Sequence, residues 1–93
     1  PANGTMFGNT DNIQFEWQRD DQVFSSLTDR LLVSSDSTFT QILIDKECIN
    51  PYFESQLDQN IYYWKVKSTD KAGNSSNFSQ TWKFTVYNVK KKL

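Results

Sequence analysis

The clearest alternation of hydrophobic and polar positions in this chain lies at residues 61–69. One set of alternate positions holds Tyr62, Trp64 and Val66. The positions between and after them hold a tyrosine and two lysines. Successive side chains of a β-strand point to opposite faces, so this period of two predicts a half-buried antiparallel strand. A polar turn that contains glycine follows at 70–76 and ends the pattern.

Two further segments alternate in the same way, at 13–17 and at 81–87. The residues expected to face inward are Ile13, Phe15 and Trp17 in the first segment and Trp82, Phe84 and Val86 in the second. Large aromatic side chains at these positions can anchor a thin core, because each of them buries a large area.

Shorter strands are predicted at 5–7, 30–34, 38–44 and 52–54. Within the second of these, Leu31 and Val33 are expected to point inward and Leu32 outward, and 45–50 is expected to be a loop. Turn signals recur about every 8 to 12 residues, which is typical of an all-β domain. The chain is therefore predicted to fold as a two-sheet antiparallel β-sandwich of about seven strands.

The segment 20–28 is compatible with two structures. Val23, Phe24 and Leu27 lie near helical spacing, and either Asp20 or Asp21 could cap a short helical turn. Within an all-β chain we favour a long loop here.

A length of 93 residues predicts one domain over 1–93. Its core is expected at 13–87, with a linker or edge strand at 1–9 and a solvated, lysine-rich tail at 88–93. The net charge of −1 provides no field to attract nucleic acid. No apolar run is long enough to insert into a membrane. We expect the chain to be a piece of a longer protein.

The order of these features resembles a fibronectin type III-like domain of the immunoglobulin-like group. The sequence Phe-Glu-Trp at 15–17 is similar to the second strand of that family. The stretch 62–76 is similar to the penultimate strand and following loop of its microbial surface members. Leu57 followed by Tyr62 resembles the tyrosine corner, whose hydroxyl bonds to nearby backbone. The spacing of this pair is one residue shorter than the family pattern.

The pattern and the resemblance together define an expected structural core. Its members are Phe15, Trp17, Leu57, Tyr62, Trp64, Val66, Phe84 and Val86.

The composition argues against catalysis. The chain has no histidine, which removes the commonest general base and metal ligand. Its single cysteine, Cys48, cannot form an internal disulfide and is expected to be a small, partly buried residue. We therefore predict no catalytic residue, no metal and no cofactor. A modest calcium site at Asp20 or Asp21 is the alternative, and the remaining loop aspartates are expected to cap turns.

Two tyrosines are the candidates for ligand contact. Tyr63 and Tyr87 fall on the solvent side of their strands, where an exposed ring can stack on a sugar or dock a protein. The alternative is that they only stabilise the sheet through cross-strand pairs. Glycosylation motifs occur at Asn3, Asn74 and Asn77.

The function expected from this sequence is that of a non-catalytic spacer in a larger extracellular or cell-surface protein. Its partners would be the neighbouring domains of the same chain, and alone it would be a monomer. The alternative is a module that binds carbohydrate or a surface protein, as part of an adhesin or a polysaccharide-degrading enzyme. Fold alone does not separate these functions.

Overall fold

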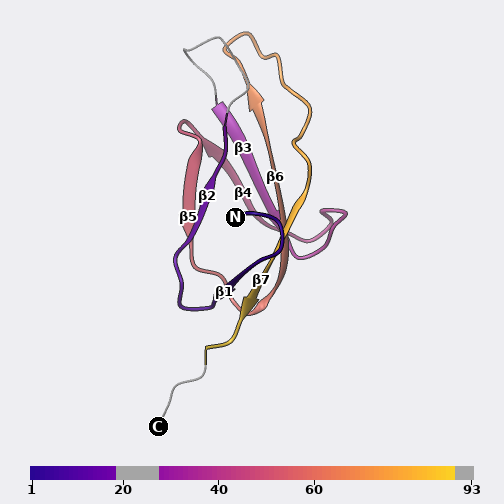
Figure 1. Ribbon diagram of the computed structural model, residues 1–93. Coiled ribbons are helices and arrows are strands. Elements are labelled where there is room, and N and C mark those ends of the chain that lie inside the picture. Colours follow the sequence, from indigo (N-terminus) through magenta and orange to yellow (C-terminus); the bar gives the residue numbers. More distant parts are fainter. Residues whose placement is uncertain (19–27, 90–93) are drawn as a thin grey trace.

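The computed structural model describes residues 1–18 and 28–89, which form an all-β structure with seven strands and no helix in these ranges (Figure 1). The strands are β1 (Thr5–Gly8), β2 (Ile13–Glu16), β3 (Thr28–Ser34), β4 (Ile42–Cys48), β5 (Tyr52–Ser55), β6 (Asn60–Thr69) and β7 (Trp82–Tyr87). Since no helix occurs in this part of the chain, none there could cross a membrane. Of the segment 20–28, which is compatible with a loop or a helical turn, residues 20–27 lie outside the described residues, and Thr28 is the first residue of β3.

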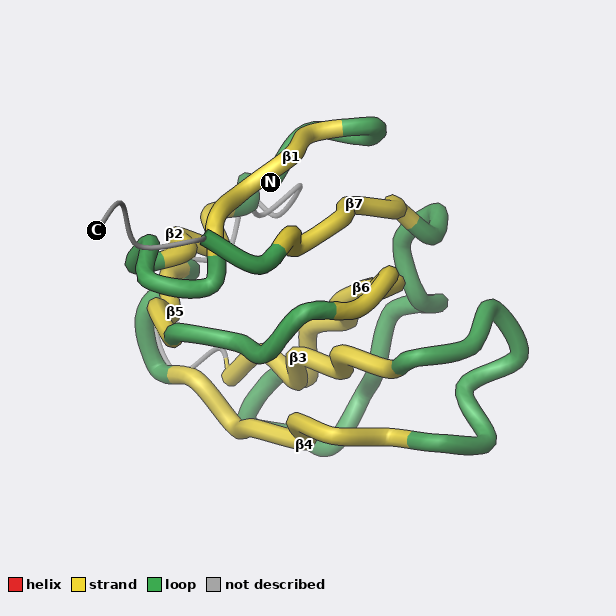
Figure 2. The backbone as a smooth tube through the Cα atoms, turned by 90° about the horizontal axis from the view of Figure 1, so that it is seen from below, coloured by secondary structure: helices red, strands yellow, loops and turns green. Residues whose placement is uncertain are grey.

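The strands form two sheets, which Figure 2 shows as separate layers. The larger sheet has the order β1-β7-β6-β3-β4, and the smaller one pairs β2 with β5. The prediction of an all-β chain with about seven strands in two sheets is confirmed, and the arrangement is consistent with a β-sandwich. The prediction of purely antiparallel sheets is wrong, because β1 pairs with β7 in parallel. No tight hairpin joins these two strands, so nothing in the chain forces them to be antiparallel.

Aromatic rings that pack between the two sheets form the core. Phe15 of β2 makes edge contacts with Trp64 and Phe84, at centroid distances of 5.4 and 5.7 Å. Tyr62 stacks on Phe84 at 5.4 Å. Ring contacts of this kind join β2 of the small sheet to β6 and β7 of the large one.

Six of the eight expected core residues are buried: Phe15, Tyr62, Trp64, Val66, Phe84 and Val86. The other two, Trp17 and Leu57, are only partly buried and pack against the edge of the core. Trp17 lies just beyond the end of β2.

Leu32 does not lie in solvent as expected. It is only 6% exposed, although its neighbours Leu31 and Val33 face the core on the opposite side of β3. The residue opposite it on β6 is Lys65, whose ammonium lies 4.2 Å from the ring centroid of Phe39 and 4.3 Å from that of Phe78. Two loops thus fold onto the outer face of the large sheet, which an alternation pattern cannot indicate.

The strand predicted at 38–44 is shifted in the structure. Residues 35–41 form a turn, and β4 runs through most of the segment that was expected to be a loop. The Asp36 carboxylate holds the turn, because it accepts hydrogen bonds from groups of Ser34, Thr38, Thr40 and Gln41. Short polar side chains that bond to nearby backbone compete in this way with a sheet ladder.

The Tyr62 hydroxyl donates a hydrogen bond of 2.6 Å to the Asp58 carbonyl, four residues upstream. This is the type of contact expected for the Leu57 and Tyr62 pair. It anchors the chain where it enters β6, and Leu57 packs beside it against the core.

Substituting Tyr62→Phe should lower the free energy of unfolding by about 1 kcal/mol, the net value of one such hydrogen bond. Chemical denaturation with urea measures the change. Tyr63→Phe is the matched control, since the Tyr63 hydroxyl makes no hydrogen bond within residues 1–18 and 28–89. Equal losses in both variants would contradict a structural role for the corner.

The stability of the fold should fall in acid. Hydrogen bonds, first from the Ser34 hydroxyl and then from Thr38, Thr40 and Gln41, hold the pKa of Asp36 far below its usual value of 3.8. A carboxylate with a lowered folded pKa stabilises the protein above its unfolded pKa and loses that contribution as the pH falls below it. The free energy of unfolding should therefore decline below about pH 4, and less steeply in Asp36→Asn.

Urea titrations between about pH 2 and 7 measure this slope. The difference between the two proteins should persist in about 1 M NaCl, because it comes from hydrogen bonds, whereas salt screens exposed ion pairs such as Arg30–Asp45. Identical acid slopes would show that the Asp36 turn does not contribute.

Candidate functional site

The two tyrosines proposed for ligand contact do not form one surface. Both lie on the outer face of the large sheet, but Tyr63 is only partly exposed and lies opposite Lys83. Tyr87 is 47% exposed and lies four residues further along β7, opposite Gly8. At the rise of an extended strand the two rings are separated by about 13 Å along the sheet.

The structure instead places a groove on the open side of the sandwich, between the end of β2 and strands β6 and β7. Two hollows of about 520 and 610 Å³ form it, and they share Trp17, Gln18, Val66 and Ser79. The second hollow is also lined by Trp64, Trp82 and the first residues of the chain. We call this continuous depression the tryptophan groove.

Three indoles form the apolar part of the tryptophan groove. Trp64 is buried, and its ring lies 4.5 Å from that of Trp82 and 6.4 Å from that of Trp17, measured between centroids. Trp17 and Trp82 are partly exposed. The Trp64 indole N–H donates to the Pro1 carbonyl at 3.1 Å, which holds the first residue of the chain against the groove.

A buried carboxylate orients Trp17. The Trp17 indole N–H donates to Asp29 at 2.8 Å, and the Ser68 hydroxyl donates to the other oxygen of Asp29 at 2.6 Å. Asp29 is fully buried at the start of β3. A buried carboxylate needs such donors to offset the loss of hydration, so the position of the Trp17 ring is tied to the core.

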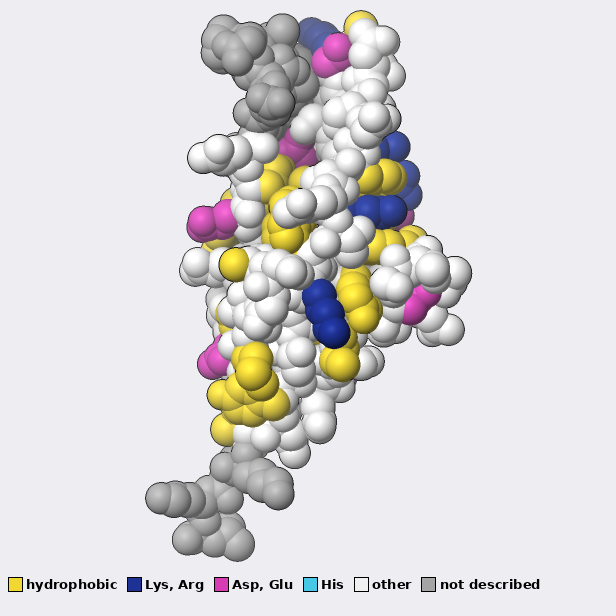
Figure 3. Space-filling view, turned by 45° about the vertical axis from the view of Figure 1, so that its right-hand side comes forward, with side chains coloured by type: hydrophobic (Ala, Val, Ile, Leu, Met, Phe, Trp, Pro, Cys, Tyr) yellow, Lys and Arg dark blue, Asp and Glu magenta, His cyan; other side chains and the backbone are white. Residues whose placement is uncertain are grey.

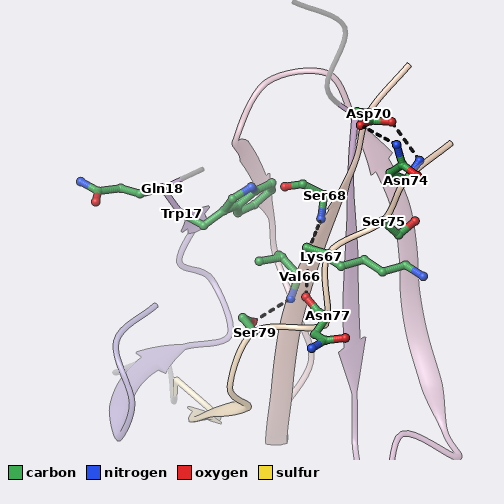
Figure 4. Close-up of a pocket in the computed structure, with 11 residues that line it drawn as sticks. Trp17, Gln18, Val66, Lys67, Ser68, Asp70, Asn74, Ser75, Asn77 and Ser79 are labelled. Atoms are coloured by element: carbon green, nitrogen blue, oxygen red, sulfur yellow. Dashed lines mark hydrogen bonds between the residues drawn. The ribbon is translucent and has the colours of Figure 1, made fainter. Parts of the chain in front are cut away.

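The polar wall of the groove comes from the loop after β6. Figure 4 shows Ser79 bonded to the backbone of Val66, and the Asp70 carboxylate facing Asn74. Asp70 accepts hydrogen bonds from the backbone of Ala72 and Asn74, which lower its pKa, the Asn74 bond most. Backbone bonds from residues 76 and 79 to β6 then hold the loop along the strand.

Three polar side chains at the groove are available to a ligand. Glu16, Gln18 and Asn77 are exposed, and their side chains make no hydrogen bond to any residue that the structure describes. Indole rings beside amide and carboxylate groups can bind a ligand that has both apolar and hydroxyl surfaces.

The other chemical candidates form no site in the described residues. No group of three or more potential metal ligands occurs there. The calcium alternative at Asp20 and Asp21 falls outside the described ranges. Cys48 is buried, and Asp45 forms a two-bond ion pair with Arg30 on the outer face.

The glycosylation motifs have different surroundings. Asn3 accepts a hydrogen bond from the Lys83 backbone, and Asn74 donates to Asp70. Asn77 is exposed on the groove wall.

No protein-family model matches this chain, and no curated protein matches it.

The alternation of hydrophobic and polar positions does not indicate the tryptophan groove. It assigned Trp17, Trp64 and Trp82 to strand faces directed at the core, which is correct for Trp64. The other two lie at strand ends, where one sheet stops covering them. A tryptophan at the last or first position of a strand pattern is the signal that could have indicated an incompletely covered ring.

Replacing Trp17 by Phe should lower the free energy of unfolding by about 2 kcal/mol, because a buried carboxylate loses a donor. Trp82→Phe is the matched control: it makes the same change of ring, but the Trp82 N–H has no hydrogen bond in the described part of the chain. Urea denaturation of both variants measures the difference. A smaller loss in Trp17→Phe than in the control would contradict the proposed anchoring by Asp29.

Proposed function

We propose that this chain is a non-catalytic, fibronectin type III-like spacer module of a larger extracellular or cell-surface protein. In this role it separates and orients neighbouring domains of the same polypeptide, and it needs no metal or cofactor. The extracellular setting rests on the resemblance of 62–76 to microbial surface members of that family.

Two features of the fold support the fibronectin type III-like assignment. In the large sheet β3 and β7 lie on either side of β6, and the small sheet pairs β2 with β5. This order is compatible with a Greek-key sandwich in which the third, sixth and seventh strands share a sheet. The hydrogen bond from Tyr62 to Asp58 is the second feature.

The pairing of the first and last strands is the observation that carries the spacer proposal. β1 and β7 run parallel and in register from Thr5 opposite Phe84 to Gly8 opposite Tyr87. Tension that enters at the start of β1 and leaves at the end of β7 loads their hydrogen bonds together, in shear. The T-shaped contact of Phe7 with Phe84, at 5.9 Å, also resists sliding of the two strands.

Single-molecule pulling in two directions tests this proposal. Handles attached through Ala2→Cys and Asn88→Cys load the β1–β7 pair in shear. Handles attached through Ala2→Cys and Lys83→Cys load the same pair from one end, so its hydrogen bonds break one at a time. Both proteins carry Cys48→Ala, so that each handle has a single attachment point.

The unfolding force should be clearly higher in the shear geometry, with one cooperative unfolding event. Equal forces in the two geometries, or stepwise unfolding in the shear geometry, would refute the mechanical proposal. Urea denaturation of both cysteine variants beforehand checks that the substitutions themselves do not alter stability.

The tryptophan groove favours a second candidate function, that of a ligand-binding module. This candidate replaces the surface of Tyr63 and Tyr87, whose rings do not lie together. The spacer proposal depends on the pairing of β1 with β7, and the binding candidate depends on the indole rings, so one domain can perform both functions.

A further inference from the structure

We propose that the tryptophan groove binds a neutral oligosaccharide chain, with Trp17 and Trp82 as its stacking surfaces and Gln18 as a hydrogen-bonding residue. This inference rests on the second candidate function, ligand binding, and it is independent of the spacer function.

The indoles provide apolar surfaces that are already oriented. Trp64 is buried, and its ring contacts the rings of both Trp17 and Trp82. Trp17 is held by its bond to Asp29, and Trp82 lies against Trp64 at 4.5 Å. Rigid rings lose little entropy on binding, and their flat faces match the C–H faces of a pyranose ring.

The polar residues at the groove match the hydroxyl groups of a sugar. Gln18 and Asn77 offer amide donors and acceptors, and Glu16 offers a carboxylate acceptor, all exposed. None of these side chains is engaged with another residue that the structure describes. Each can therefore bond to a hydroxyl without breaking an internal hydrogen bond.

The charges at the groove favour a neutral ligand. Lys67 lines it, but its ammonium lies 5.0 Å from the ring centroid of Phe78, on the outer side of the sheet. Glu16 adds a negative charge, and the Asp70 carboxylate is occupied by its own turn. Among the described residues no arginine, and no lysine other than Lys67, lines the groove, so an acidic sugar would gain no ion pair with a side chain here.

The shape of the groove favours a chain of sugars over an extended peptide. The backbone N–H of Trp17 donates to the carbonyl of Pro51, which precedes β5. Since backbone groups of alternate residues point to opposite edges of a strand, those of Gln14 and Glu16 face the open edge of β2. Two residues are a short template for adding a strand, and Pro1 and Ala2 line the same hollow. The two hollows both include Trp17, so a ligand that lies along them can be held by side chains and needs no hydrogen bonds to a strand backbone.

Isothermal titration with neutral hexasaccharides of β-1,4-linked glucose, xylose, mannose and N-acetylglucosamine tests this proposal. Tryptophan fluorescence serves as a second readout, because a sugar on an indole changes its emission. Trp82→Ala and Gln18→Ala test the groove. Tyr87→Ala and Gln59→Ala are the matched controls, since both residues are exposed and lie outside it.

We expect at least one hexasaccharide to bind and to shift the fluorescence. Each groove variant should weaken this binding by about tenfold or more, and neither control should change it. Gln18→Ala keeps the test valid if Trp82→Ala does not fold, because Gln18 is exposed and makes no internal hydrogen bond to the described residues.

Three results would overturn the proposal. The first is that no hexasaccharide binds at about 10 mM, a concentration tenfold above a Kd of about 1 mM. The others are loss of binding in Tyr87→Ala alone, and binding of extended peptides but of no sugar. The pulling experiment is unaffected by these outcomes, so failure of the sugar proposal does not imply failure of the spacer proposal. Binding of peptides alone would leave the ligand-binding function in place with a different ligand.

Discussion

The contact between Phe15 and Trp64 is the interaction on which the rest of this structure depends. The small sheet has only two strands, and such a pair is marginally stable unless it packs on something larger. Phe15 provides that packing, because it is fully buried and meets Trp64 and Phe84 of the large sheet edge-on. Trp64 in turn supports Trp17 and Trp82 and bonds to Pro1. The core and the groove therefore share one ring.

Asp29 connects the groove to the fold in a second way. A fully buried carboxylate is costly unless strong donors surround it, and Trp17 and Ser68 are two of its partners. One donor comes from the end of β2 and the other from β6, so the carboxylate joins the two sheets where the groove begins. The hydrogen bond from the Trp17 indole to Asp29 therefore stabilises the buried carboxylate and also orients the Trp17 ring, one of the proposed stacking surfaces.

Alternation of side chains predicted the strands whose two faces differ most. The segments around Phe15, Trp64 and Phe84 form strands as expected, because one face of each packs in the core. The pattern failed where local polar bonding competed with it. The Asp36 turn replaces the start of the strand predicted at 38–44, and β4 extends instead through a charged segment that follows. Leu32 was placed in solvent because no pattern shows that loops cover the outer face.

The amino-acid sequence alone predicts an all-β fold with about seven strands in two sheets, because the period of two is a local property of the backbone. It also determined the absence of histidine chemistry. The three-dimensional contacts place β1 parallel to β7, and they leave Trp17 and Trp82 at an open groove while Tyr63 and Tyr87 lie apart. These features depend on which strands become neighbours and where one sheet ends over another. Contacts between distant segments set them, and alternation along a single segment carries no information about such contacts.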